Sequence, residues 1–227
     1  MYAKSLLTSA LTATAMLLTL SSCRDEGVDG PVEMTCTDIV TFAGSDGSGH
    51  ATFTFQKADD SPEITLVSSN TINTDNIDEG TRLLLSYIPA DNEPYRSGPV
   101  NVLGGQSIAQ STVALEWLKE YDDWDKYPVY VYSAWRSGRY INMHVRLTYS
   151  LNPRLFHLAV DPATIEAERP DVYLVHVMAD DVDNHDRAYY ASFDLTPLWT
   201  LPHVRGINLH VANSNLNKHI FTFDKSL

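Results

Sequence analysis

The sequence predicts an all-β protein of two modules, a five-stranded barrel followed by an antiparallel β-sandwich, with a short connecting helix. Short runs in which apolar and polar residues alternate recur along most of the 227 residues. Breaks rich in Gly, Pro, Asp or Asn separate these runs, which is typical of strands joined by tight turns. One segment with helical spacing, near residue 115, divides five such runs from the seven that follow.

The first 22 residues form an export signal in outline. Met1 to Lys4 is a short basic head, and Leu6 to Leu20 is an apolar run diluted by threonine and serine. A membrane-spanning helix needs about 20 consecutive apolar residues, and this run is shorter. We therefore expect residues 1–22 to be a signal peptide that is removed.

The signal ends at the tetrad Leu20-Ser21-Ser22-Cys23. This tetrad resembles a bacterial lipobox, and the resemblance implies cleavage between Ser22 and Cys23 and attachment of diacylglycerol and palmitate-type chains to the Cys23 thiol. Two acyl chains suffice for stable anchoring, so the protein would be held at a membrane through its N-terminal lipid. The alternative is an ordinary secretory signal whose cysteine falls at this place by chance.

The net charge and the composition limit the classes of partner that the chain is expected to bind. The chain has 16 Lys and Arg against 29 Asp and Glu, a formal net charge of −13. Nucleic acid and anionic membrane surfaces attract clustered basic residues, so this balance excludes them as expected partners. Residues 23–32 are acidic and rich in Gly and Pro, and we expect them to be a flexible tether.

The first module spans residues 33–110. The turn "GSDGSG", from Gly44 to Gly49, joins two alternating runs as a hairpin. Five short strands suit an OB-like barrel; they are expected at 35–42, 50–56, 63–69, 81–88 and 99–104. Cys36 alternates with Asp38, Val40 and Phe42 on one strand face, and we expect its thiol to be buried and inert.

A linker helix is expected over residues 111–126. Its best part is "STVALEWLKEY", with Ser111 or Thr112 as N-cap and Val113, Trp117 and Leu118 near one face. The β-sandwich module then spans residues 127–227. Its clearest strand is "YINMHVRLTY", from Tyr140 to Tyr149, in which alternate residues are apolar. Strands are also expected at 129–135, 154–160, 171–178, 188–195, 206–213 and 219–223.

Candidate chemical sites are few. The histidines show no metal-ligand spacing, so no metal site is predicted. The acidic loop with Asp180, Asp181, Asp183 and Asp186 lacks the Gly and Glu of an EF-type calcium loop, and whether it binds a cation stays open. No nucleophile elbow, phosphate loop or dinucleotide fingerprint occurs, so we expect no catalytic residues, no cofactor and no enzyme activity.

Aromatic residues are the remaining candidates for ligand binding. Exposed rings in a sugar-binding module stack on pyranose faces, whereas rings in an ordinary sandwich fill its core, and core filling is favoured for any single ring. The residues in question are Trp117, Trp124, Trp135, Trp199 and the twelve tyrosines.

A resemblance to a known family rests on several stretches in order. These are "SAWRSGRYINMHVRL" from Ser133 to Leu147, then "FHLAVDP", "DVYLVHVMADD" and "YYASFDLTPL". Together they resemble the NigD-like lipoproteins of Bacteroidota across most of residues 79–198. The resemblance implies an N-terminal OB domain, a C-terminal β-sandwich and an outer-membrane location, and it carries no catalytic residues.

The expected function is that of a non-enzymatic, lipid-anchored outer-membrane lipoprotein of the cell envelope. It would bind an envelope protein or a glycan, facing either the periplasm or the cell surface. One alternative is a metal-dependent or hydrolytic envelope enzyme built from dispersed His and Asp residues. Another is a bacteriocin-associated or immunity-type protein, which rests only on the family name.

Overall fold

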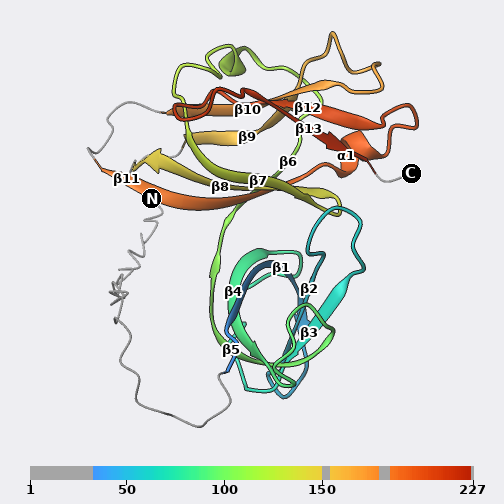
Figure 1. Cartoon of the computed structure of the whole chain (residues 1–227), viewed down its shortest axis with the longest axis vertical. Coiled ribbons are helices and arrows are strands. Elements are labelled where there is room, and N and C mark those ends of the chain that lie inside the picture. The colour runs from blue at the N-terminus through green and yellow to red at the C-terminus, as the bar shows by residue number, and fades with distance from the viewer. Residues whose placement is uncertain (1–32, 150–153, 179–184, 226–227) are drawn as a thin grey trace, which may run out of the picture. The chain divides into compact units, whose positions relative to one another are not determined.

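The computed structural model describes residues 33–149, 154–178 and 185–225 (Figure 1). Residues from Glu33 onward form one compact unit. Within the described ranges, no helix is long and apolar enough to cross a lipid bilayer. Nearly all of the regular structure is β, as the sequence predicts.

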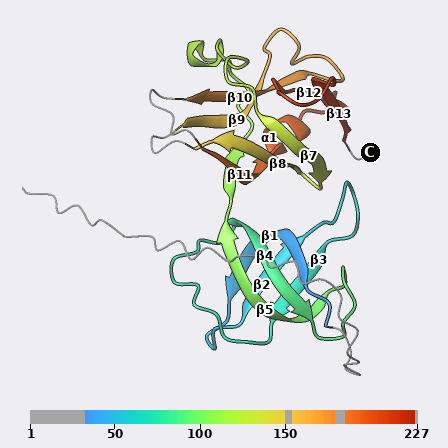
Figure 2. The same ribbon diagram turned by 60° about the vertical axis from the view of Figure 1, so that its left-hand side comes forward.

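The first module is a closed barrel with strand order β1-β2-β3-β5-β4. The labels in Figure 1 follow this order around the barrel, and Figure 2 shows the same barrel from the side. Strands β3 and β5 pair in parallel and the other neighbours are antiparallel. The strands are β1 (Cys36–Ser45), β2 (Ala51–Phe55), β3 (Ile64–Ser68), β4 (Arg82–Pro89) and β5 (Gly98–Ser107). Each expected strand of this module is therefore present.

The predicted hairpin between β1 and β2 is also present. Asp46 closes it, since its backbone N–H donates to the His50 carbonyl oxygen at 2.9 Å. One oxygen of the Asp46 carboxylate also accepts the N–H groups of Ser48 and His50. Gly49 has a φ of +81°, a conformation that L side chains rarely adopt, so a glycine suits this position.

The apolar side chains that alternate along the strands form the core of the barrel. Val40 and Phe42 of β1 face Phe53, Leu66 and other apolar side chains inside it. Cys36 lies on the same side and is 7 % exposed, so the prediction of a buried thiol is confirmed. Each large apolar side chain that is fully buried contributes about 1.5–3 kcal/mol relative to an exposed one.

The second module consists of two four-stranded sheets that lie face to face (Figure 1). One has the order β13-β12-β10-β9 and the other β6-β11-β8-β7. Strands of the first are β9 (Arg154–Val160), β10 (Asp171–Met178), β12 (Gly206–His210) and β13 (Ile220–Asp224). Strands of the second are β6 (Ala109–Thr112), β7 (Tyr130–Ser137), β8 (Tyr140–Thr148) and β11 (Asp186–Asp194).

The core of the sandwich lies between these two sheets. The alternation predicted for β8 is confirmed, because Ile141, Met143 and Val145 are completely buried. They pack with residues of the facing sheet such as Leu158 and Leu174. The other face of β8 is polar, and it is covered only in part.

The connecting segment differs from the sequence-based expectation. Instead of a helix from residue 111, strand β6 runs to Thr112 and pairs in parallel with β11, and the Val113 N–H donates to the Asp194 carbonyl oxygen at 2.9 Å. Only a single 3₁₀ turn, η1 (Lys119–Tyr121), follows within residues 111–126. Sheet pairing provides partners for these backbone groups, and it overrides a weak helical pattern. The short α-helix α1 (Thr196–Trp199) lies elsewhere in the chain.

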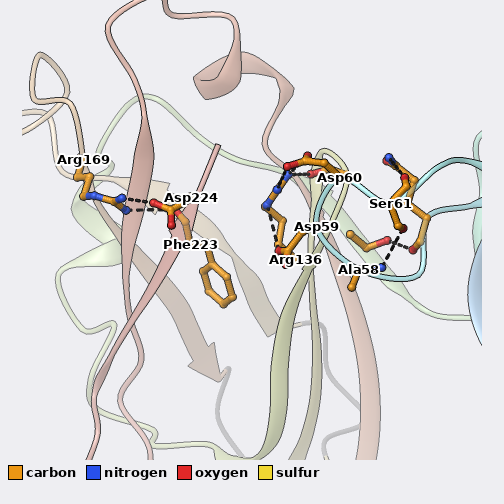
Figure 3. A network of polar contacts seen from close by, with 11 residues as sticks. Ala58, Asp59, Asp60, Ser61, Arg136, Arg169, Phe223 and Asp224 are labelled. Atoms are coloured by element: carbon orange, nitrogen blue, oxygen red, sulfur yellow. Dashed lines mark hydrogen bonds and ion pairs between the residues drawn. The ribbon is translucent and has the colours of Figure 1, made fainter. Parts of the chain in front are cut away.

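Arg136 of β7 ties the sandwich to the barrel. Its side chain is 4 % exposed, and its two terminal nitrogens donate to the two Asp60 carboxylate oxygens at 2.9 and 2.6 Å (Figure 3). Beside it, the Gly138 N–H donates to the Asp59 carbonyl oxygen at 2.7 Å. Bidentate pairs of this kind add geometric specificity to charge. The loop after β2 is therefore held against the β7–β8 turn.

Candidate functional site

Several of the sites proposed from sequence lie outside the described residues. These are the cleavage and lipid-attachment residues Ser22 and Cys23, together with most of the acidic loop, including Asp180, Asp181 and Asp183. Asp186, at the end of that loop, begins β11, where its carboxylate accepts the Thr148 hydroxyl at 3.1 Å. Lipid attachment and cation binding by the loop thus remain predictions.

The histidines occupy separate environments. His144 of β8 is stacked between the rings of Tyr132 and Tyr190, at centroid distances of 4.5 and 4.2 Å. His176 is buried beside β9, and His210 contacts an Asp171 oxygen at 2.9 Å. No group of three or more His, Cys, Asp or Glu side chains in the described ranges is arranged to hold a metal ion.

The four tryptophans lie in different parts of the structure. Trp135 lines a cavity between the barrel and the sandwich, and Trp199 packs partly buried against the sandwich core. Trp117 and Trp124 instead line a surface hollow of about 530 Å³ on the sandwich. We call this the aromatic hollow; its lining residues are Trp117, Trp124, Asp161, Pro162, Ala163 and Tyr173.

The connecting segment builds one wall of the aromatic hollow. After β6, the chain crosses the outer face of β9 and β10, where Tyr121 packs with Ala159 and Val175 in a small apolar cluster of its own. Trp117 and Trp124, before and after the η1 turn, border this cluster. The burial of Tyr121 thus fixes the segment, and both indole rings lie against Tyr173 of β10.

Strand β10 supplies the third ring. The Tyr173 ring meets the Trp117 ring edge to face at a centroid distance of 5.5 Å and the Trp124 ring at 4.7 Å. His210 of the neighbouring β12 stacks on Tyr173 at 4.5 Å with an interplanar angle of 15°. The Asp171 carboxylate orients His210 in turn. Such aromatic pairs contribute about 0.5–1.5 kcal/mol each beyond area burial, so the three rings are held before any ligand arrives.

Polar groups of the aromatic hollow are also positioned. The Trp117 Nε1–H donates to the Asp122 carboxylate at 2.9 Å. One oxygen of Asp161 accepts the Ala163 N–H at 2.9 Å, which fixes the carboxylate at the start of the β9–β10 turn. Burial raises the pKa of Tyr173, and the charges of Asp171 and Asp161 add to the effect, so its hydroxyl is a neutral donor at physiological pH.

All three rings are half-buried, and each therefore keeps surface for a ligand. Sequence reasoning singled out Trp117 and Trp124 but favoured core positions for single rings, and it did not single out Tyr173 or Asp161. Tyr173 shares a strand face with Asp171, opposite to the buried Val172 and Leu174. That alternation is the signal that identifies it as an outward ring.

Comparison with known proteins identifies the fold. No family model and no curated protein matches the chain. Among solved structures, a protein of unknown function from Bacteroides vulgatus superposes with a TM-score of 0.64 at 14 % identity, over 86 % of this chain and 92 % of that one. A NigD-like immunity protein from Bacteroides caccae gives 0.55 at 17 %, over 83 % and 91 %.

A third solved structure, a candidate lipoprotein from Bacteroides fragilis, gives a TM-score of 0.56 at 12 % identity, over 84 % of this chain and 96 % of that one. The coverage of each pair is high, so the likeness extends over both modules. The fold implied by the sequence resemblance is thus confirmed. The chain shares the barrel-and-sandwich fold of these proteins of Bacteroidota, among them one that is NigD-like.

Proposed function

We propose that this chain is a lipid-anchored protein of the bacterial cell envelope that binds a glycan in the aromatic hollow. The observation that carries the proposal is the arrangement of Trp117, Trp124 and Tyr173, half-buried around about 530 Å³. Pyranose rings have one apolar face of C–H groups and a rim of hydroxyls. Indole and phenol rings complement the apolar C–H face, and a fixed carboxylate accepts hydrogen bonds from the hydroxyl rim.

The volume and the lining residues of the aromatic hollow favour a glycan over a purely apolar ligand. Small-molecule sites usually enclose about 300–1,000 Å³, and the aromatic hollow falls within that range. Asp161 at its border accepts hydrogen bonds from hydroxyl groups, which an apolar ligand does not offer. The net charge of −13 favours neutral sugars over strongly acidic polymers, because like charges repel.

Preorganisation supports a binding role as well. Tyr173 is stacked by His210, and Trp117 is held by its hydrogen bond to Asp122, so ligand binding immobilises few side chains. Rings that are already ordered lose less entropy on association, which raises affinity. A protein partner that inserts an aromatic side chain into the hollow is the competing occupant.

Fluorescence titration tests the glycan proposal. The full chain, in a detergent without sugar headgroups, is titrated with starch, xylan, mannan and soluble peptidoglycan fragments, and tryptophan emission is recorded. At least one glycan should change the emission saturably. Trp124→Ala should weaken that binding at least tenfold, which corresponds to about 1.4 kcal/mol.

Trp135→Ala is the matched control, because Trp135 lines a different cavity. It should bind the glycan like the unaltered protein. If no glycan changes the emission, or if both variants lose affinity equally, the aromatic hollow is not a glycan site. Retention of an envelope protein by the full chain but not by Trp124→Ala would instead favour the protein partner.

Anchoring is tested separately in producing cells fed labelled palmitate. The unaltered chain should carry the label in the membrane fraction, and Cys23→Ser should lose both the label and the membrane location. Labelling that persists in Cys23→Ser would overturn the lipid anchor. It would leave the glycan proposal untouched, because the aromatic hollow is built within residues 33–227.

A further inference from the structure

Arg82 lies at the start of β4, on the side of the barrel that meets the sandwich, and it is 2 % exposed. Its Nε donates to the Ser192 hydroxyl at 3.0 Å, and its terminal nitrogens donate to the Thr41 hydroxyl at 2.7 Å and to the Asn142 side-chain oxygen at 3.2 Å. The Tyr140 ring lies 4.1 Å from the guanidinium carbon. Each of these partners is electrically neutral.

The charge of Arg82 therefore lacks an ion-pair partner within 4 Å among the described residues. Asp194 is nearby, but its carboxylate pairs with Arg139 at 3.3 Å and accepts the Thr196 N–H and hydroxyl. Burial lowers the pKa of Arg82 to about 10, so the guanidinium is still protonated at neutral pH. A buried cation without a counter-charge is costly, and proteins rarely keep one without a use.

Two cavities border this cation. Their volumes are about 240 and 160 Å³, and both are lined by Arg82, Arg139 and Tyr140. In the larger cavity the remaining polar groups include Thr54, Gln56 and Ser137. The smaller cavity is lined by Ser111, whose buried hydroxyl has no hydrogen-bond partner in the described chain. Donors from both modules thus surround the two spaces.

We propose that these cavities bind a small, singly charged carboxylate, which pairs with Arg82 and Arg139. A guanidinium has five N–H donors, and Arg82 directs three of its bonds to the neutral partners named above, so donors remain for a ligand. Glu63 also lines the larger cavity and Asp194 lines the smaller one, and these two negative charges disfavour anions with two or more charges. The volume fits a hydroxy acid or a single uronic acid residue.

This site shares no residue with the aromatic hollow, so the two proposals fail or stand separately. Thermal unfolding of the full chain in detergent tests the carboxylate, with lactate, galacturonate, phosphate and sulfate compared at constant ionic strength. A ligand selective for the folded state raises its midpoint. Galacturonate or lactate should raise Tm by about 5 °C at saturation, and phosphate and sulfate should raise it less.

Arg139→Gln is the decisive variant, because the Arg139 side chain is 56 % exposed and its loss leaves the buried network in place. It should weaken carboxylate binding roughly tenfold. Arg96→Gln, on an exposed barrel turn, is the matched control and should bind normally. Arg82→Lys should abolish binding; if it does not fold, the Arg139→Gln result decides alone.

Three results would overturn the proposal. The first is that no carboxylate raises Tm. The second is that all four anions act alike, which would indicate a general salt effect. The third is that Arg139→Gln and Arg96→Gln respond equally, which would assign Arg82 a purely structural role between barrel and sandwich.

Discussion

Replacing His176 with glutamine should make the stability of this fold less sensitive to acid. His176 lies on β10, and its ring is 3 % exposed. Its Nδ1 lies 2.8 Å from the Tyr127 carbonyl oxygen, and its Nε2 lies 3.3 Å from a terminal nitrogen of Arg154. Nδ1 therefore donates a proton and Nε2 accepts one, which is the arrangement of a neutral imidazole.

Protonation of His176 would place a second N–H against the Arg154 guanidinium, inside a buried site. Burial is the largest cause that holds the pKa of His176 below its ordinary value of 6.5, and the charge of Arg154 adds to it. The bond to the Tyr127 carbonyl acts in the opposite direction. The folded state thus binds fewer protons than the unfolded state.

This difference in bound protons determines how stability changes with pH. Stability from His176 is fully present above pH 6.5 and is lost as the pH falls toward the lower pKa of the folded state. The steepest loss that one group can cause is about 1.4 kcal/mol per pH unit. Burial also lowers the pKa of His144 and His157, so an acid dependence remains in the variant.

Urea unfolding at pH 7.5, 6.5 and 5.5 measures the effect. Glutamine can still donate to the Tyr127 carbonyl, and any constant loss of stability cancels when slopes are compared. The free energy of unfolding of His176→Gln should fall less steeply below pH 6.5 than that of the unaltered chain. Parallel slopes for His176→Gln and the unaltered chain would refute the buried neutral imidazole.

Two further predictions concern packing and the thiol. Gly206→Ala places a Cβ 2.7 Å from the Phe223 carbonyl oxygen, so this variant should lose about 1–3 kcal/mol of unfolding free energy, measured with urea. Gly104→Ala is the control and should lose clearly less, because a Cβ there has no atom within 4 Å. Equal losses in the two variants would contradict the steric argument. Cys36 is 7 % exposed, and burial followed by the charge of Asp38 raises its pKa, so alkylation by iodoacetamide should be slow in the native protein and fast in urea. Rapid alkylation without urea would show that the barrel opens readily.

Strand positions were predictable because their cause is local. In β8, Ile141, Met143 and Val145 lie on the buried face, and the polar residues between them lie on the other face. Such alternation of apolar and polar residues has a period of two, which can be read directly from the sequence. The β1–β2 turn was predictable for a similar reason, since its glycines and Asp46 act within six residues.

The connecting segment was not predictable in this way. Val113 donates its N–H to the carbonyl oxygen of Asp194, a residue far along the chain, and no local pattern reports such a partner. A helix and this strand compete for the same backbone groups. The pairing with β11 decides the outcome, because a strand inside a sheet satisfies its donors and acceptors at once.

By itself, the sequence determined the all-β class, the strand positions other than β6, the acidic charge and the lipobox-like tetrad at Cys23, because each depends on composition or on residues that are neighbours in the chain. The tertiary structure alone decided which side chains meet. Trp117 and Tyr173 share one hollow, and Arg82 lies buried against Ser192. Strand order sets these distances, and strand order follows from closing a barrel and stacking two sheets, which no single segment encodes.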